Sequence, residues 1–273
     1  MLKMKVYIQF DFEGVAGFVI RDNQDRNIPV VFERTRRLMK IATAEVSAAA
    51  EGAFAAGADE VVAWDSHGSG NTLLVEELAE KVQLITGDTD KGPWLPFFEG
   101  TDAGIYIGGH AMAGTPFATV PHTLMEVNGK AYGEVGMFIL ECGSKNVPVV
   151  MVSGDSAVKD EVSELIPQAE FVVTKIAAGP TLVKTITPAL SCKMIFEAAK
   201  RGVGSRKNIL PFKLPPPYKF KIPPKDGSSD SYFTNRDDDL LTAYRNYLKD
   251  CYGYSQGWPE WNLRKPDKAI NCL

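Results

Sequence analysis

Segments with the pattern of a β-strand alternate with helix-like segments along the first two-thirds of this 273-residue chain. Such alternation indicates βαβ units, in which a mainly parallel sheet is flanked by helices. The predicted fold class is therefore α/β. The expected strands cover residues 5–10, 59–64, 82–86, 103–109, 147–154 and 170–175, and the expected helices cover residues 32–57, 73–81, 133–145, 155–167 and 187–202.

The character of the sequence changes near residue 205, where we place a domain boundary. We expect a metal-binding catalytic α/β domain over residues 1–205 and a smaller α+β part over residues 206–273. The proline-rich stretch 209–230 is either a linker or a strand hairpin with prolines at its edges. A helix is expected over residues 238–253. The tail beyond it carries Trp258 and Trp261 without clear periodicity. These tryptophans either form a subunit interface or cover a local core, and we favour oligomer contacts.

Composition excludes several classes of protein. Hydrophobic residues make up 45% of the chain and charged residues 23%, which predicts a sizeable core. A net charge of -4 argues against a nucleic-acid partner, since such binders usually carry a basic excess. The N-terminus does not resemble a signal peptide, and no apolar run reaches the roughly 18 residues of a membrane helix. With four widely spaced cysteines, these features predict a reduced, cytoplasmic protein without a membrane partner.

Two carboxylates close the first predicted strand, in the stretch "YIQFDFEGVAG" over residues 7–17. Asp11 and Glu13 are two positions apart, so in an extended strand their side chains point to the same face. Neighbouring carboxylates repel each other unless a proton or a cation lies between them. The pair therefore predicts a binding partner for negative charge elsewhere in the chain.

The chain has only three histidines, and they provide candidates for that partner. His67 and His110 each follow a predicted strand, His122 lies in a loop, and Glu134 begins a predicted helix. In an open α/β sheet, ligands bind outside the carboxyl ends of the strands. Five metal-capable side chains should therefore meet at one edge of the sheet: Asp11, Glu13, His67, His110 and Glu134.

Two imidazoles and three carboxylates suit zinc better than magnesium, which prefers oxygen ligands. Five protein ligands exceed the three of a typical catalytic zinc site, but they fit two zinc ions if one carboxylate bridges them. Each residue taken singly also has an ordinary structural explanation, so the joint pattern carries the prediction. Asp155 is expected only to cap the following helix, and Asp65 is a candidate partner for a histidine.

Five motifs occur together in the chain. They are "DFEG" at 11–14, "WDSHGSGNTLLVEELAEKVQLITGD" at 64–88, "YIGGHAMAGTPFATVPHTL" at 106–124, "NGKAYGEVGMF" at 128–138 and "VPVVMVSGDSAVKDEVSELIP" at 147–167. With them the chain resembles the DppA-like D-aminopeptidases, zinc peptidases of the dipeptide-transport-operon type. The resemblance covers roughly residues 5 to 200.

The resemblance implies two zinc ions per chain, with Asp11 bridging both metals. It implies that Glu13 and His67 complete one zinc site, that His110 and Glu134 complete the other, and that His122 is the nucleophile. It further implies release of N-terminal D-amino acids from short peptides, and assembly into a decamer, a homo-oligomer whose active sites face an inner channel.

This sequence departs from the family pattern at two places. Gln9 stands where the family usually has serine, which affects a contact behind the ligands rather than a ligand. Gly179 and Pro180 occupy a stretch where a basic residue is expected, which could change the grip on a substrate or a neighbouring subunit.

The function predicted from sequence is a zinc-dependent aminopeptidase acting on short peptides, with His122 as nucleophile or general acid/base. One alternative is a magnesium-dependent phosphatase of the haloacid-dehalogenase type, because "QFDFEGV" and "GDSAVKD" superficially match its acidic motifs. That alternative leaves all three histidines unexplained. A second alternative is a non-catalytic, metal-stabilised binding or assembly protein.

Overall fold

A seven-stranded sheet forms the centre of the computed structural model, which describes residues 3–19, 27–88, 94–179, 181–222 and 233–252. The strand order is β3-β2-β1-β4-β7-β8-β9, and neighbouring strands are parallel except for the antiparallel pair β8–β9. The α/β fold class is confirmed. The strands are β1 (Lys5–Phe10), β2 (Glu60–Asp65), β3 (Val82–Ile85), β4 (Ala103–Gly109), β7 (Val149–Asp155), β8 (Glu170–Gly179) and β9 (Leu182–Thr185).

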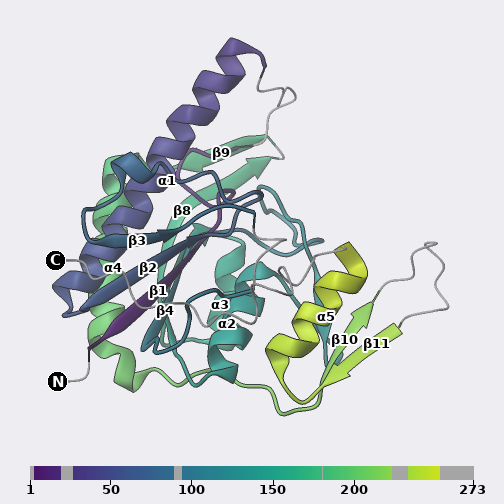
Figure 1. Cartoon of the computed structure of the whole chain (residues 1–273). Coiled ribbons are helices and arrows are strands. Elements are labelled where there is room, and N and C mark those ends of the chain that lie inside the picture. The colour runs from purple at the N-terminus through teal and green to yellow at the C-terminus, as the bar shows by residue number, and fades with distance from the viewer. Residues whose placement is uncertain (1–2, 20–26, 89–93, 180, 223–232, 253–273) are drawn as a thin grey trace.

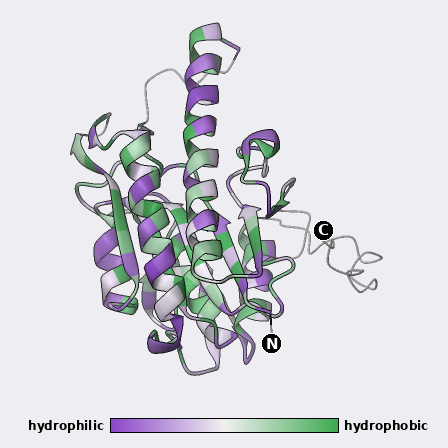
Figure 2. Ribbon diagram, turned by 90° about the vertical axis from the view of Figure 1, so that its left-hand side faces the viewer, coloured by the Kyte–Doolittle hydropathy of each residue, from purple (hydrophilic) through white to green (hydrophobic). Residues whose placement is uncertain are grey.

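Helices cover both faces of this sheet (Figure 1). α1 (Pro29–Ala55) and α4 (Pro188–Ser205) pack together on one face, and α2 (Glu134–Ser144) and α3 (Val158–Leu165) lie on the other. The central strand β1 serves both layers, because alternate side chains point to opposite faces. Ile8 belongs to the core beneath α1 and α4, and Tyr7 belongs to the core beneath α2. The N-terminal half of α1 extends beyond the sheet and is largely hydrophilic (Figure 2).

A second, antiparallel sheet has the order β11-β10-β5-β6 and packs against α5 (Leu240–Tyr252). Its strands are β5 (Met125–Val127), β6 (Lys130–Tyr132), β10 (Tyr218–Ile222) and β11 (Phe233–Asp237). The proline-rich stretch 209–230 supplies β10, one strand of a hairpin whose other strand, β11, begins beyond that stretch. This sheet takes strands from both sides of residue 205, and the domain boundary there stays a prediction. The two tryptophans of the tail lie outside the described residues.

The helix predicted over residues 73–81 is wrong. Only a short 3-10 helix, Val75–Glu77, forms there. Side chains hold the backbone before this turn: Asp65 accepts the N–H groups of Thr72 and Leu73, and the hydroxyl of Thr43 accepts that of Leu74. The segment is therefore fixed as a loop by side-chain to backbone bonds.

Three short strands escaped prediction, namely β5, β6 and β9. Each has only three or four residues, too few for a period of two to be recognised. The hairpin β5–β6 has a functional consequence, because it joins the loop that carries His122 to the helix that begins with Glu134. The fold thereby brings these two residues back to the edge of the sheet where β1, β2 and β4 end.

Candidate metal centre

The candidate residues meet at the carboxyl edge of the sheet, as predicted from the strand pattern. Asp11 directly follows β1, His67 lies two residues beyond β2, and His110 directly follows β4. Because β1 lies between β2 and β4, these three positions are neighbours in the sheet. The backbone N–H of Asp11 still bonds to the carbonyl of Ile107 of β4 at 2.8 Å, so the pairing of the two strands extends to this residue.

The first group of potential ligands comprises Asp11, Glu13 and His67, whose ligand atoms all lie within 4.8 Å of one another. His67 Nε2 is 3.4 Å from Glu13 Oε1. The other ring nitrogen, His67 Nδ1, lies 2.8 Å from the hydroxyl of Thr72. A partner at Nδ1 fixes the orientation of the ring and directs Nε2 toward the carboxylates.

The second group comprises His110, Glu134 and His122, again with ligand atoms within 4.8 Å of one another. Glu134 Oε1 is 3.5 Å from His110 Nε2 and 3.8 Å from His122 Nε2. The two imidazole rings stack with centroids 3.8 Å apart. His110 Nδ1 lies 3.0 Å from the backbone carbonyl of Ala111, which orients this ring without a second side chain.

Asp11 connects the two groups. Its Oδ2 lies 3.4 Å from His110 Nε2, while the same side chain belongs to the group of Glu13 and His67. Its Oδ1 is occupied, because it accepts the backbone N–H of Phe12 at 2.8 Å. The position of Asp11 between the groups fits a carboxylate shared by two cations.

The site contains buried polar atoms that lack hydrogen bonds within the described part of the chain: Asp11 Oδ2, Glu13 Oε2 and His110 Nε2. Buried polar groups are nearly always hydrogen-bonded, so orphaned ones indicate a site for a further partner such as an ion. The orphaned atoms are carboxylate oxygens and an imidazole nitrogen, which is the donor set that zinc binds. The residues present therefore fit the metal that the sequence predicts.

The pKa shifts of the candidate ligands also indicate a site for a cation. Burial, followed by the charges of Glu13 and Glu134, raises the pKa of Asp11 well above its ordinary value. Burial also acts to raise the pKa of Glu13 and Glu134, but contact with His67 and His110 respectively lowers it overall. Buried His110 has a raised pKa because Glu134 outweighs the effect of burial. The pocket thus favours bound positive charge, which a cation supplies without protonating a ligand.

His122 differs from the other histidines in its surroundings. Its side chain is 45% exposed, whereas that of His110 is 1% exposed. The ring is oriented by a contact of 2.9 Å between Nδ1 and the carbonyl of Val120. Its loop is anchored by Asp155, whose Oδ2 accepts a hydrogen bond from the Thr119 hydroxyl at 3.1 Å.

Asp155 and Asp65 can now be assigned. Asp155 Oδ1 accepts the backbone N–H groups of Ala157 and Val158 at the start of α3, which agrees with the predicted cap. Its bond to the loop of His122 was not predicted. Asp65 acts on His67 through Thr72. Its carboxylate accepts the backbone N–H of Thr72, and the Thr72 hydroxyl contacts the His67 ring.

Two further charged residues at the site were missed from sequence. Lys175 of β8 is fully buried, and its Nζ donates hydrogen bonds to the carbonyls of Glu13 and Val15. Glu161 of α3 accepts the backbone N–H of Gly133 at 2.8 Å, directly before Glu134. Lys175 lies outside the five motifs, and Glu161 lies inside one of them without having been given a role there. Both contacts join residues more than 25 positions apart, so the tertiary structure is needed to reveal them.

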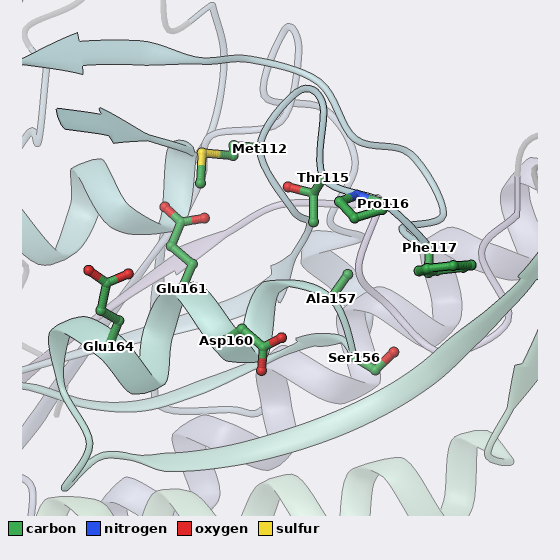
Figure 3. Close-up of a pocket in the computed structure, with 9 residues that line it drawn as sticks. All are labelled: Met112, Thr115, Pro116, Phe117, Ser156, Ala157, Asp160, Glu161 and Glu164. Atoms are coloured by element: carbon green, nitrogen blue, oxygen red, sulfur yellow. The ribbon is translucent and has the colours of Figure 1, made fainter.

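A cavity of about 470 Å³ lies beside the site, between the loop after β4 and helix α3 (Figure 3). Met112 and the carboxylates of Asp160, Glu161 and Glu164 belong to its wall. None of the six candidate residues lines it. Of its lining residues, Glu161 contacts the backbone next to a predicted ligand, through Gly133.

Within the described ranges, the structure contains no helix that is both long and apolar enough to cross a membrane. Cys142 and Cys192, which lie in these ranges, are free thiols.

Comparisons with known proteins agree with the fold and the site. The chain is 31% identical over 222 residues to a D-aminopeptidase of Bacillus subtilis (strain 168), a match that covers 78% of each chain. Its structure is similar to that of the Zn-dependent D-aminopeptidase DppA from Bacillus subtilis, described as a self-compartmentalizing protease. That similarity has a TM-score of 0.77 and 26% identity, and it covers 90% of this chain and 96% of the other. A family model described as D-aminopeptidase matches residues 4–229. The chain therefore belongs to the D-aminopeptidase family.

Proposed function

We propose that this protein is a dinuclear zinc aminopeptidase that releases N-terminal D-amino acids from short peptides. The observation that carries the proposal is the pair of ligand groups joined through Asp11, with its orphaned carboxylate and imidazole atoms. Family membership and the zinc dependence of the Bacillus subtilis protein support the same conclusion. They also favour it over the phosphatase alternative.

In this proposal Glu13 and His67 hold one zinc ion, His110 and Glu134 hold the other, and Asp11 bridges them. Three carboxylates offset most of the charge of two divalent cations. When bound, the zinc ions supply Lewis-acid polarisation of the scissile carbonyl. The protein contributes the fixed directions of its ligands: strand ends hold Asp11 and His110, and the first turn of α2 holds Glu134.

His122 is the proposed catalytic residue. Its ring is exposed on one side and stacks on His110 on the other, so it can reach a substrate held at the site. Its contact with the Val120 carbonyl occupies Nδ1 and leaves Nε2 directed toward Glu134. From this position Nε2 can serve as a nucleophile or transfer a proton to or from the reacting peptide.

The substrate class rests on the family and on the name of the Bacillus subtilis relative. We expect the protein to hydrolyse D-Ala-D-Ala and to leave L-Ala-L-Ala intact. Comparable rates on the two enantiomers would refute the assigned stereochemistry and leave the metal site untouched.

The deciding experiment combines metal analysis with an assay of turnover. The purified protein should contain close to two zinc ions per chain, lose activity on chelation and regain it when zinc is restored. Two zinc ions without turnover of any D-dipeptide would instead support the second alternative, a metal-stabilised binding or assembly protein. A magnesium requirement without zinc would favour the phosphatase.

We further propose a homo-oligomer, a decamer as the family resemblance implies, with cytoplasmic location. The description of the Bacillus subtilis protein as self-compartmentalizing supports an assembly of many subunits. Light scattering at working concentration tests this directly. A monomer or dimer would contradict the decamer without affecting the proposed chemistry.

A further inference from the structure

The turn that carries Glu13 is held by β8, a strand that contributes none of the predicted ligands. Three successive backbone carbonyls of this turn, those of Glu13, Gly14 and Val15, are all bound by two successive residues of β8. Lys175 Nζ donates to the carbonyls of Glu13 and of Val15, the latter at 3.0 Å. The Thr174 hydroxyl donates to the carbonyl of Gly14 at 2.6 Å.

The opposite side of the turn is equally constrained. The N–H of Gly14 bonds to the carbonyl of Gly108 at 2.7 Å. A Cβ atom added to Gly14 would lie 2.1 Å from the carbonyl oxygen of Gly109, so the backbone there has no room to shift toward β4. The turn is therefore clamped between the end of β4 and the pair Thr174–Lys175.

The lysine is costly to bury, and its surroundings show why it is tolerated. Its side chain is 1% exposed, and burial lowers its pKa to about 8, against the opposing influence of the carboxylates of Asp155 and Glu45. Those two carboxylates, with Glu13 and Asp11, are the acidic groups that face it. If the position were needed only for packing, an apolar residue would fill it without the free-energy cost of burying a charged amine.

We propose that Lys175, assisted by Thr174, is a positioning residue for the zinc ion held by Glu13 and His67. By fixing the backbone on both sides of Gly14, it sets the direction in which the Glu13 carboxylate projects toward His67. The other zinc ion depends on His110 and Glu134, whose backbone β8 does not hold through these contacts. The clamp therefore acts on one metal of the two. This inference rests on the proposed two-zinc site.

The test is the affinity of each zinc ion, measured by chelator competition on the zinc-loaded full chain, with melting temperature recorded beside it. In Lys175→Met, one zinc ion should bind about 10- to 100-fold more weakly, the range typical for losing a group that orients a ligand, and the other should bind as before. Thr174→Val should shift the same zinc ion in the same direction by less. Lys184→Met, the same change on the exposed face of β9, is the matched control and should leave both affinities unchanged.

Adding Lys175→Met to a variant that already lacks His67 identifies which zinc ion is affected. His67→Ala removes a ligand of the Glu13 side only, so the remaining zinc ion should be held with the same affinity whether or not Lys175→Met is added. A change in that remaining ion would overturn the proposal, because the clamp would then act on the whole centre.

The outcomes also separate this inference from the proposed function. A wild-type protein that binds fewer than two zinc ions contradicts the dinuclear site itself. Two zinc ions held by folded Lys175→Met with wild-type affinity, even with a lowered melting temperature, would reduce the clamp to a purely structural feature. If Lys175→Met does not fold, the same comparison on Thr174→Val decides, and wild-type zinc affinities there overturn the proposal.

Discussion

The two halves of the candidate centre are built in different ways, although each offers a carboxylate and an imidazole. On the Glu13 side, the imidazole of His67 is oriented by the Thr72 hydroxyl, and the carboxylate follows a turn held by the side chains of β8. On the Glu134 side, the imidazole of His110 is oriented by a backbone carbonyl, and its carboxylate begins a helix.

This difference shows which substitutions can alter the orientation of each ligand histidine. A backbone carbonyl stays in place whatever residue carries it, so the orientation of His110 is insensitive to substitution at Ala111. The orientation of His67 can be altered by a single change at Thr72. Mutations that leave the ligands intact should therefore affect the Glu13 side more readily, while both sides share the dependence on Asp11.

The largest effect is expected for Asp11→Ala, because Asp11 contacts His110 and also belongs to the group of Glu13 and His67. The variant should lose more zinc than any other single ligand change, and its activity should fall to background. Elemental analysis of the dialysed protein measures this. Asp160→Ala, which removes an exposed carboxylate from the neighbouring cavity, is the control and should retain both ions. One zinc ion still fully bound in Asp11→Ala would refute the bridging role.

The next prediction compares alanine substitutions of the two predicted ligand histidines. His67→Ala and His110→Ala should each lose zinc and activity together, since each removes one of the few protein ligands of its ion. His110 is buried and His67 is partly exposed, so His110→Ala also leaves a cavity and should lower the melting temperature more. Metal analysis and thermal unfolding of the two variants, measured side by side, test both statements. Retention of two zinc ions in either variant would contradict the ligand assignment.

His122→Ala tests whether the exposed histidine belongs to the metal site or to the reaction. We expect near-full zinc content, an unchanged melting temperature and a loss of about 10²- to 10⁴-fold in turnover, the usual contribution of a general acid or base. Steady-state kinetics beside metal analysis measures this. Loss of zinc would make His122 a ligand, which its 3.8 Å distance from Glu134 permits. Full turnover would make it a bystander.

The sequence was sufficient for the parts of the site that depend on strand ends. Asp11, His67 and His110 could be predicted to meet because each follows a strand of a parallel sheet, and such ends share one edge. The return of Glu134 to the same edge depends on β5 and β6, which are too short to leave a pattern. Its inclusion among the ligands rested on its residue type and on its position at the start of a predicted helix.

The supporting contacts could not be predicted. Lys175 meets Glu13 across 162 positions of the chain, and nothing in the stretch around it distinguishes it from a surface lysine. Thr72 directly precedes the segment 73–81 that we predicted to be helical, and its backbone is held by Asp65 in a loop. In both cases the error has one cause: side-chain to backbone bonds are decided by tertiary proximity, and amphipathic periodicity does not report them.

The smallest predicted effect is also the most selective test of the difference between the halves. Thr72→Val keeps the shape of the side chain but removes the hydroxyl that lies 2.8 Å from His67 Nδ1. The ring then loses its contact at Nδ1, and the zinc ion of the Glu13 side should bind about 10- to 100-fold more weakly, while the ion of the Glu134 side is unaffected. Thr72→Ser restores the hydroxyl and should restore the affinity.

Thr43→Val is the matched control for this last experiment. Thr43 also holds the same loop, through a bond from the N–H of Leu74 to its hydroxyl, but it does not contact the His67 ring through that bond. The control should lower the melting temperature and leave both zinc affinities unchanged. If Thr43→Val weakens zinc as much as Thr72→Val does, the effect comes from a loosened loop, and the hydroxyl of Thr72 has no specific role in orienting His67. If Thr72→Val weakens both zinc ions equally, the two halves are coupled through Asp11 strongly enough that a disturbance on one side is felt on the other.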